Sequence, residues 1–104
     1  MALTEAELQA TIVDTAELAG WLVYHDHDSR LNPAGLPDLI LVKPPRVVFL
    51  ELKSDKGRVR PDQQIWLDAL EQCDTLTSAL VRPDDLPTVI DYLTKKANNN
   101  EQAC

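Results

Sequence analysis

The stretch GLPDLILVKPPRVVFLELKS at residues 35–54 consists of two short apolar runs joined by a proline turn, and three of its charged side chains, Asp38, Glu51 and Lys53, are of types that suit metal-ion chemistry. Residues two apart on a strand share a face, so Glu51 and Lys53 project the same way. Asp38 opens the neighbouring apolar run, and a hairpin about Lys43–Arg46 would bring its carboxylate close to that of Glu51. Two partly buried carboxylates repel, which a shared proton or a divalent cation relieves. Oxygen ligands suit Mg²⁺ or Mn²⁺, which would polarise a phosphodiester, while Lys53 would orient the attacking water or stabilise developing charge.

Each of these residues also has a purely structural interpretation when it is taken singly. Asp38 after Pro37 is typical of a turn, and Glu51 with Lys53 would make a same-face ion pair on an exposed edge strand. That interpretation must also explain why the two acids lie at neighbouring ends of adjacent strands. It must explain as well why the basic loop SDKGRVR (54–60) follows directly after the second strand. The combination favours a functional site.

The elements that must position these residues alternate between helix and strand patterns. Thr4 and Glu7 have capping-box spacing, which predicts a helix beginning at Glu5, and Pro61 suits the first position of a second helix. The expected elements are a helix over 5–18, strands over 21–25, 38–42 and 47–53, a helix from 61, a strand over 75–81 and a helix over 83–96. The order α-β-β-β-α-β-α predicts an α/β sandwich, a small mixed sheet with helices on both faces.

The second helix is expected to have one apolar side. The residues that its periodicity places along this side are Ile65, Trp66, Ala69, Leu70 and Cys73. The tryptophans, Trp21 and Trp66, are most simply core residues.

Length and composition limit the class of protein. The 104 residues, of which 44% are hydrophobic and 26% charged, are typical of one soluble globular domain, expected over 1–97 with a disordered polar tail at 98–104. No window approaches the roughly 18 apolar residues of a membrane span. The N-terminus lacks a signal-peptide pattern, and Cys73 and Cys104 lack metal-ligand spacing. We therefore expect reduced thiols and a cytoplasmic location.

The net charge of −7 argues against a nucleic-acid partner until its distribution is considered. Residues 1–29 hold six acids and no base, and residues 61–104 hold eight acids and three bases. Residues 30–60 hold seven bases against three acids. The basic centre of the chain therefore coincides with the segment that contains Asp38, Glu51 and Lys53.

The ordered pattern resembles a known nuclease family. PD at 37–38 and ELK at 51–53 match the PD-(D/E)xK signature, and residues 4–72, from an E-x-x-L-Q helix to a Q-x-x-W helix, are similar to the VRR-NUC branch of that superfamily. The resemblance implies a restriction-endonuclease-like fold and a metal-dependent DNA endonuclease with a role in DNA repair. Small stand-alone members, found in phages and bacteria, look like Holliday junction resolvases that act as homodimers, so a bacterial cell or a phage-infected host is the expected setting.

The resemblance assigns roles to the central residues of the signature. Asp38 and Glu51 match the two acidic metal ligands, and Lys53 matches the catalytic lysine. Leu52 would supply a main-chain carbonyl to the metal.

Two helical residues extend the resemblance. The family's first-helix glutamate corresponds to Glu5, which lies on the arc of Leu8 and Ile12, whereas Glu7 points away and already serves the capping box. The alternative for Glu5 is a first-turn acid favoured by the helix dipole. Gln63 matches the family's second-helix glutamine, with plain surface polarity as its alternative.

Further residues are candidate DNA contacts. His25, Ser29 and Arg30 lie between the first strand and the PD turn, where they could contact phosphate or a metal-bound water, although His25 could simply pack at a strand end. The loop cations form the expected phosphate clamp, with a solvated loop as the alternative; they are Lys56, Arg58 and Arg60.

The sequence thus predicts a Mg²⁺- or Mn²⁺-dependent phosphodiesterase that cleaves DNA, in particular branched DNA such as Holliday junctions, as a homodimer. A flap- or end-processing nuclease is the alternative among enzymes. A catalytically silent DNA-binding or protein-interaction module with the same fold is the alternative from another class. The intact set of Asp38, Glu51 and Lys53 favours catalysis over that module.

Overall fold

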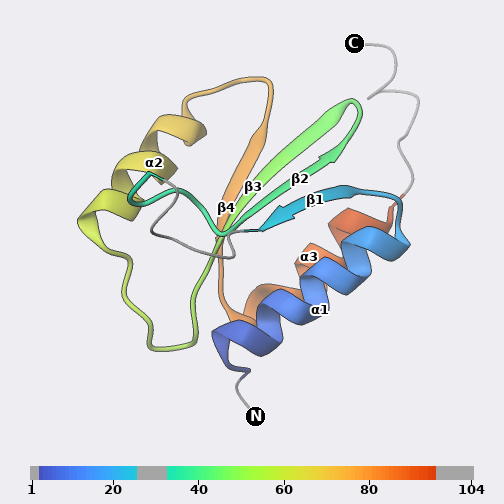
Figure 1. The fold of residues 1–104 in the computed structure, drawn as a ribbon, viewed down its shortest axis with the longest axis horizontal. Coiled ribbons are helices and arrows are strands. Elements are labelled where there is room, and N and C mark those ends of the chain that lie inside the picture. The colour runs from blue at the N-terminus through green and yellow to red at the C-terminus, as the bar shows by residue number, and fades with distance from the viewer. Residues whose placement is uncertain (1–2, 26–32, 96–104) are drawn as a thin grey trace.

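The computed structural model describes residues 3–25 and 33–95, which form one four-stranded sheet with three α-helices around it (Figure 1). In chain order the elements are α1 (Glu5–Leu18), β1 (Leu22–His25), β2 (Leu39–Lys43), β3 (Arg46–Leu52), α2 (Pro61–Glu71), β4 (Thr77–Val81), a 3₁₀ turn (Pro83–Asp85) and α3 (Leu86–Thr94). The predicted α-β-β-β-α-β-α order is confirmed. The predicted tail at 98–104 lies outside the described residues.

The sheet is mixed, with strand order β1-β2-β3-β4. β1, β2 and β3 pair antiparallel, and β4 pairs parallel with β3, so that β3 is an interior strand. The hairpin register sets Lys43 opposite Arg46 across Pro44 and Pro45, and it sets Leu39 opposite Leu50. The end of β3 is therefore brought to the start of β2.

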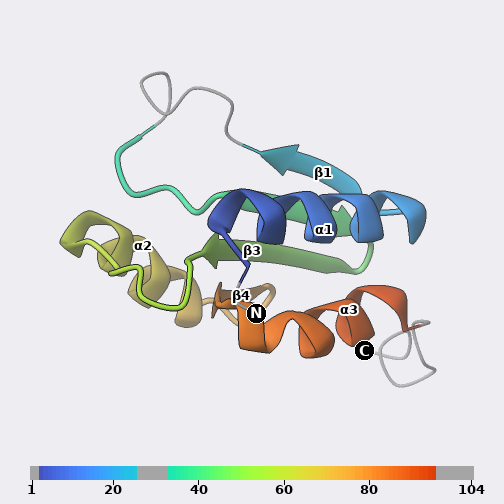
Figure 2. The same ribbon diagram turned by 90° about the horizontal axis from the view of Figure 1, so that it is seen from below.

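The helices cover the two faces of the sheet unequally. α1 and α3 lie side by side across one face, and α2 packs on β4 from the other (Figure 2). The strand alternation fits this layering, because Val48, Leu50 and Leu52 are buried beneath α1 and α3 together with Leu8 and Ile12 of α1. Side chains at the odd positions of β3 therefore face the opposite side, on which Glu51 lies.

Local signals account for the first helix. Thr4 and Glu7 form the predicted capping box, in which the Glu7 amide donates to Thr4 Oγ1 at 3.1 Å and the Thr4 amide donates to Glu7 Oε1 at 2.9 Å.

The described helices include none that is long and apolar enough to cross a bilayer.

The C-terminal elements depart from the prediction in detail. The helix expected over 83–96 begins as the 3₁₀ turn, and the α-helix starts only at Leu86. The main chain of α3 is held at its C-terminal end by Arg46 of β3 and by Trp21, which precedes β1. Arg46 Nη1 donates to the Tyr92 carbonyl at 3.0 Å, and Trp21 Nε1 donates to the Leu93 carbonyl at 2.9 Å. The buried Arg46 guanidinium also lies 4.6 Å from the centre of the Trp21 ring.

The apolar side predicted for α2 is wrong in part. Leu70 is buried, but Ile65 is 70% exposed and Gln63 is buried instead. Trp66 is half-buried outside the main core, whereas Trp21 belongs to the core as expected. A polar side chain of the first turn of α2, that of Gln63, therefore faces inward.

Candidate functional site

Asp38, Glu51 and Lys53 meet where β2 begins and β3 ends. The Asp38 carboxylate oxygen Oδ2 accepts a hydrogen bond from the Leu52 amide at 2.8 Å, which fixes it beside the end of β3. Since a strand residue directs its N–H and its C=O toward the same neighbour, the Leu52 carbonyl faces the Asp38 side as well. The hairpin register thus gathers two carboxylates and a main-chain carbonyl at one end of the sheet.

Lys53 pairs with Glu51 inside the protein. Lys53 Nζ lies 3.6 Å from Glu51 Oε2, and the side chains are only 9% and 1% exposed. The Lys53 amide donates to the Val81 carbonyl at 3.0 Å, which continues the parallel ladder with β4. The ion pair therefore does not lie on an exposed edge strand, and that structural alternative fails.

Glu51 is the least satisfied polar group of the site. Neither of its carboxylate oxygens has a hydrogen-bond partner among the described residues. The pKa of Glu51 is raised to about 7, and burial is the largest cause. The negative charge of Asp38 contributes to the increase, Lys53 opposes it and Glu5 adds a smaller contribution. A buried carboxylate that lacks donors needs either a proton or a further cation.

These residues open into a polar pocket of about 450 Å³. Its charged and amide side chains come from the starts of α1 and α2, from β2 and from β3; they are Glu5, Asp38, Glu51, Lys53, Arg60 and Gln63. Predicted site residues separated by almost 60 positions in the sequence are therefore brought to one place.

Gln63 is buried in the wall of this pocket, whereas Glu5 is exposed at its rim. Gln63 is 6% exposed, and its Oε1 accepts a hydrogen bond from the Arg60 amide at 2.9 Å. The alternative of plain surface polarity for Gln63 is therefore wrong. Glu5 is exposed in the first turn of α1, so a dipole-stabilised acid at the pocket mouth remains a sufficient description of it.

The loop over 33–37 forms one wall of the pocket by packing on the first turn of α2. Gly35 has φ +86°, and a Cβ at this position would collide with the main-chain carbonyl of Asp62. Trp66 Nε1 donates to the Ala34 carbonyl at 3.1 Å and holds the same loop from α2. The glycine of the G-x-PD pattern thus allows the backbone approach that places Asp38.

The pocket suits a cation that the protein ligates only in part. Among the described residues, no group of three or more His, Cys, Asp or Glu side chains is arranged to hold a metal ion alone. Two carboxylates, one of them buried without donors, and a carbonyl are oxygen ligands of the kind that Mg²⁺ accepts while keeping waters or substrate oxygens. The donor set therefore fits Mg²⁺ or Mn²⁺ and does not suit a closed structural metal site.

Other predicted contact residues lie outside the pocket wall. Lys56 and Arg58 are exposed on the loop after β3, and only Arg60 of that loop lines the pocket. His25 ends β1 opposite Leu39 and is not among the lining residues. The predicted contacts at 29 and 30 fall outside the described residues.

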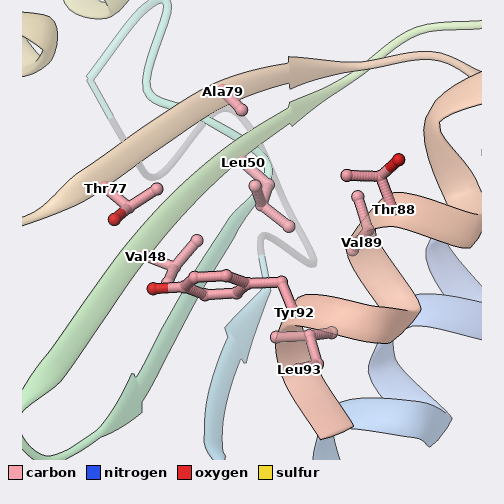
Figure 3. Close-up of a pocket in the computed structure, with 8 residues that line it drawn as sticks. All are labelled: Val48, Leu50, Thr77, Ala79, Thr88, Val89, Tyr92 and Leu93. Atoms are coloured by element: carbon pink, nitrogen blue, oxygen red, sulfur yellow. The ribbon is translucent and has the colours of Figure 1, made fainter. Parts of the chain in front are cut away.

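A second hollow has none of this polarity. A cleft of about 190 Å³ lies between α3 and the strands β3 and β4. Its lining includes Leu50, Ala79, Val89 and Tyr92 (Figure 3). Its lining contains no carboxylate and no basic side chain. This cleft is incomplete packing at the margin of the core and offers no group for hydrolytic chemistry.

Comparisons with known proteins agree with the geometry. The family model described as VRR-NUC domain matches residues 2–81. A solved structure described as a VRR_NUC domain superposes with a TM-score of 0.68 over 86% of this chain and 98% of that chain, with 19% sequence identity. At that identity the likeness establishes the fold. No curated protein matches the chain.

The raised pKa of Glu51 predicts an inverse dependence of stability on pH. Its pKa is about 7 in the folded protein against 4.5 for an unperturbed glutamate, so the folded state binds more protons between these values. The stabilising contribution is full below about pH 4.5 and is lost as the pH rises through about 7. Glu51→Gln removes the charge. We therefore expect the melting temperature of Glu51→Gln, relative to that of the wild type, to be higher at pH 8 than at pH 5 when both are measured in EDTA.

Thermal unfolding of both proteins at the two pH values checks this expectation. Glu17→Gln, at an exposed position of α1, is the matched control and should track the wild type. Equal differences between Glu51→Gln and the wild type at pH 5 and pH 8 would refute a raised Glu51 pKa.

Proposed function

The chain belongs to the VRR-NUC family, which points to a nuclease-type function, and from this premise we propose a Mg²⁺- or Mn²⁺-dependent deoxyribonuclease of the PD-(D/E)xK type. The observation that carries the proposal is the buried Glu51 carboxylate, which has no hydrogen-bond donor among the residues that the structure describes and lies beside Lys53 in a pocket shared with Asp38. A site that served stability alone would satisfy or remove such a group.

Asp38, Glu51 and the Leu52 carbonyl would hold the metal ion. When bound, the ion would polarise the scissile phosphodiester and make an attacking water more acidic. The Leu52 amide keeps the Asp38 carboxylate aimed at the same place, because it donates to Oδ2 at 2.8 Å. The site is thereby organised before substrate arrives.

Lys53 would act as an electrostatic catalyst. Its ammonium lies 3.6 Å from Glu51 Oε2 and borders the pocket, where it would orient the water or stabilise charge that develops on the phosphate. Burial strengthens such an interaction, since few waters are available to screen it. Gln63, which also lines the pocket, would contact the substrate or the attacking water.

DNA would approach over the loop after β3. This loop carries Lys56, Arg58 and Arg60, and the last of these reaches the pocket, so that phosphate contacts lead into the site. We propose branched DNA, such as a four-way junction, as the preferred substrate, with flaps or ends as the alternative. A silent DNA-binding or interaction module remains the alternative outside the enzymes.

A homodimer would double the small basic surface and place two sites on one junction. An apolar sheet face supports this part of the proposal. Leu22 and Tyr24 of β1 are 72% and 43% exposed, and Ile40, Val42 and Phe49 continue the same face in the register. Burial of this face against a second copy would remove it from water. Sedimentation velocity of the wild type and Tyr24→Glu tests the assembly, since a wild-type monomer would contradict it.

Cleavage of linear, flap, Y-form and four-way junction DNA in Mg²⁺ and in Mn²⁺ tests the function. We expect cleavage by the wild type, fastest on the junction, and none by Asp38→Asn or Glu51→Gln, because each amide removes a charge needed by the metal. Lys53→Ala should slow single-turnover cleavage by about 10²- to 10³-fold.

Asp14→Asn, an exposed change on α1, should cleave like the wild type and controls for the loss of a surface charge. Undiminished cleavage by both Asp38→Asn and Glu51→Gln would exclude this site. Cleavage of none of the DNAs by a folded wild type would favour the silent module.

The basic loop predicts a separate effect on affinity. Replacing Lys56, Arg58 and Arg60 by alanine should weaken junction binding in Ca²⁺ and flatten its dependence on salt, because each lost phosphate contact removes about 0.9 from the slope. Fluorescence anisotropy at several salt concentrations measures both quantities. An unchanged slope would mean that the loop is only solvated.

A further inference from the structure

Arg82 binds the loop that follows β3, although Arg82 and this loop are remote from each other in the sequence. Its Nη1 donates to the main-chain carbonyls of Ser54 at 2.7 Å and Gly57 at 2.8 Å, with a longer contact of 3.4 Å to that of Asp55. The guanidinium therefore binds main-chain atoms only in these contacts, so it holds the path of the loop whatever side chains the loop carries.

The sheet places Arg82 at this point. Val81 is the last residue of β4 and lies opposite Leu52 in the parallel register, and its carbonyl accepts from the Lys53 amide. Arg82 is the next residue and thus emerges beside Lys53 and Ser54. Figure 1 shows the segment leaving β4 next to the connection from β3 to α2.

The bound loop also packs against Lys53. The Gly57 amide donates to the Ser54 carbonyl at 3.2 Å, which closes a turn over 54–57. A Cβ on Gly57 would lie 3.3 Å from Lys53 Cδ, so the aliphatic part of that side chain lies next to the turn and has little room to move toward it. A side chain confined in this way keeps its ammonium beside Glu51.

We propose that Arg82 is a positioning residue that acts through Lys53: by holding the turn over 54–57 it fixes the Lys53 ammonium at the pocket. This role rests on the proposed nuclease function. It differs from DNA contact by Arg82, because the guanidinium nitrogen that binds the loop donates to carbonyls of the protein itself.

Single-turnover cleavage at saturating enzyme, combined with DNA binding in Ca²⁺, tests this role. Displacement of a catalytic group by about 1 Å can cost about 10²-fold in rate, so Arg82→Ala should slow cleavage of bound DNA by about 10- to 100-fold. The salt slope of binding should be unchanged. Arg82→Lys, which keeps donors but not the planar fork, should restore part of the rate.

The decisive comparison is a double-mutant cycle with Lys53→Ala. If Arg82 acts through Lys53, adding Arg82→Ala to Lys53→Ala should cause no further loss of rate. Multiplicative losses would overturn the proposal, and so would a wild-type rate in Arg82→Ala. A salt slope that falls by about 0.9 would also overturn it, because Arg82 would then contact a phosphate.

Two further variants separate positioning from folding. Arg46→Ala also removes an arginine bound to main-chain carbonyls, but those carbonyls are at the end of α3, so it should lower the melting temperature and leave the rate of the folded protein unchanged. Gly57→Ala adds a methyl group 3.3 Å from Lys53 Cδ and keeps the main-chain carbonyl that accepts from Arg82, so it should slow cleavage even if Arg82→Ala does not fold. Normal rates in Gly57→Ala would contradict confinement by the turn. No cleavage by the wild type would overturn the nuclease function together with this role.

Discussion

The burial of Glu51 beside Asp38, with Lys53 as the nearby cation, is the constraint on which the rest of the structure depends. Removing a carboxylate from water is costly, and an ion pair at 3.6 Å does not supply the hydrogen bonds that the carboxylate oxygens lack. The balance leaves the Glu51 pKa at about 7. The protein therefore maintains a group that is stabilised by protonation or by a second cation, and the adjoining pocket gives such a cation access.

The fold supplies this arrangement through backbone pairing. The β2–β3 hairpin sets Asp38 against the end of β3, and the parallel pairing with β4 buries that end as an interior strand. α1 and α3 form the core on the opposite face of the sheet, which leaves the Glu51 face free to be lined by polar groups of α2 and of the loop at Gly35. The main apolar core thus lies on one face of the sheet, and the Glu51 side chain lies on the other.

Local patterns predicted much of this organisation. The capping box at Thr4 located α1, and strand alternation placed Glu51 and Lys53 on one face, because both effects depend on neighbours in sequence. The contribution of α2 was not predictable in the same way: its Gln63 faces inward while Ile65 remains exposed, since the pocket below this helix is polar. The signal at Gly35 was present as part of G-x-PD, but its reason is a collision with Asp62 that only the tertiary structure reveals. Arg82 gave no signal at all, because its partners are carbonyls some 25 residues away.

We propose that Asp38 and Glu51 form a site for a divalent cation. Calorimetric titration of Mn²⁺ into the wild type, Asp38→Asn, Glu51→Gln and the surface control Asp14→Asn tests it without reference to substrate. We expect one saturable site in the wild type and in Asp14→Asn, and binding weakened at least about tenfold in each of the two site variants, because each loses a charged ligand. Equal Mn²⁺ affinity in all four proteins would contradict it.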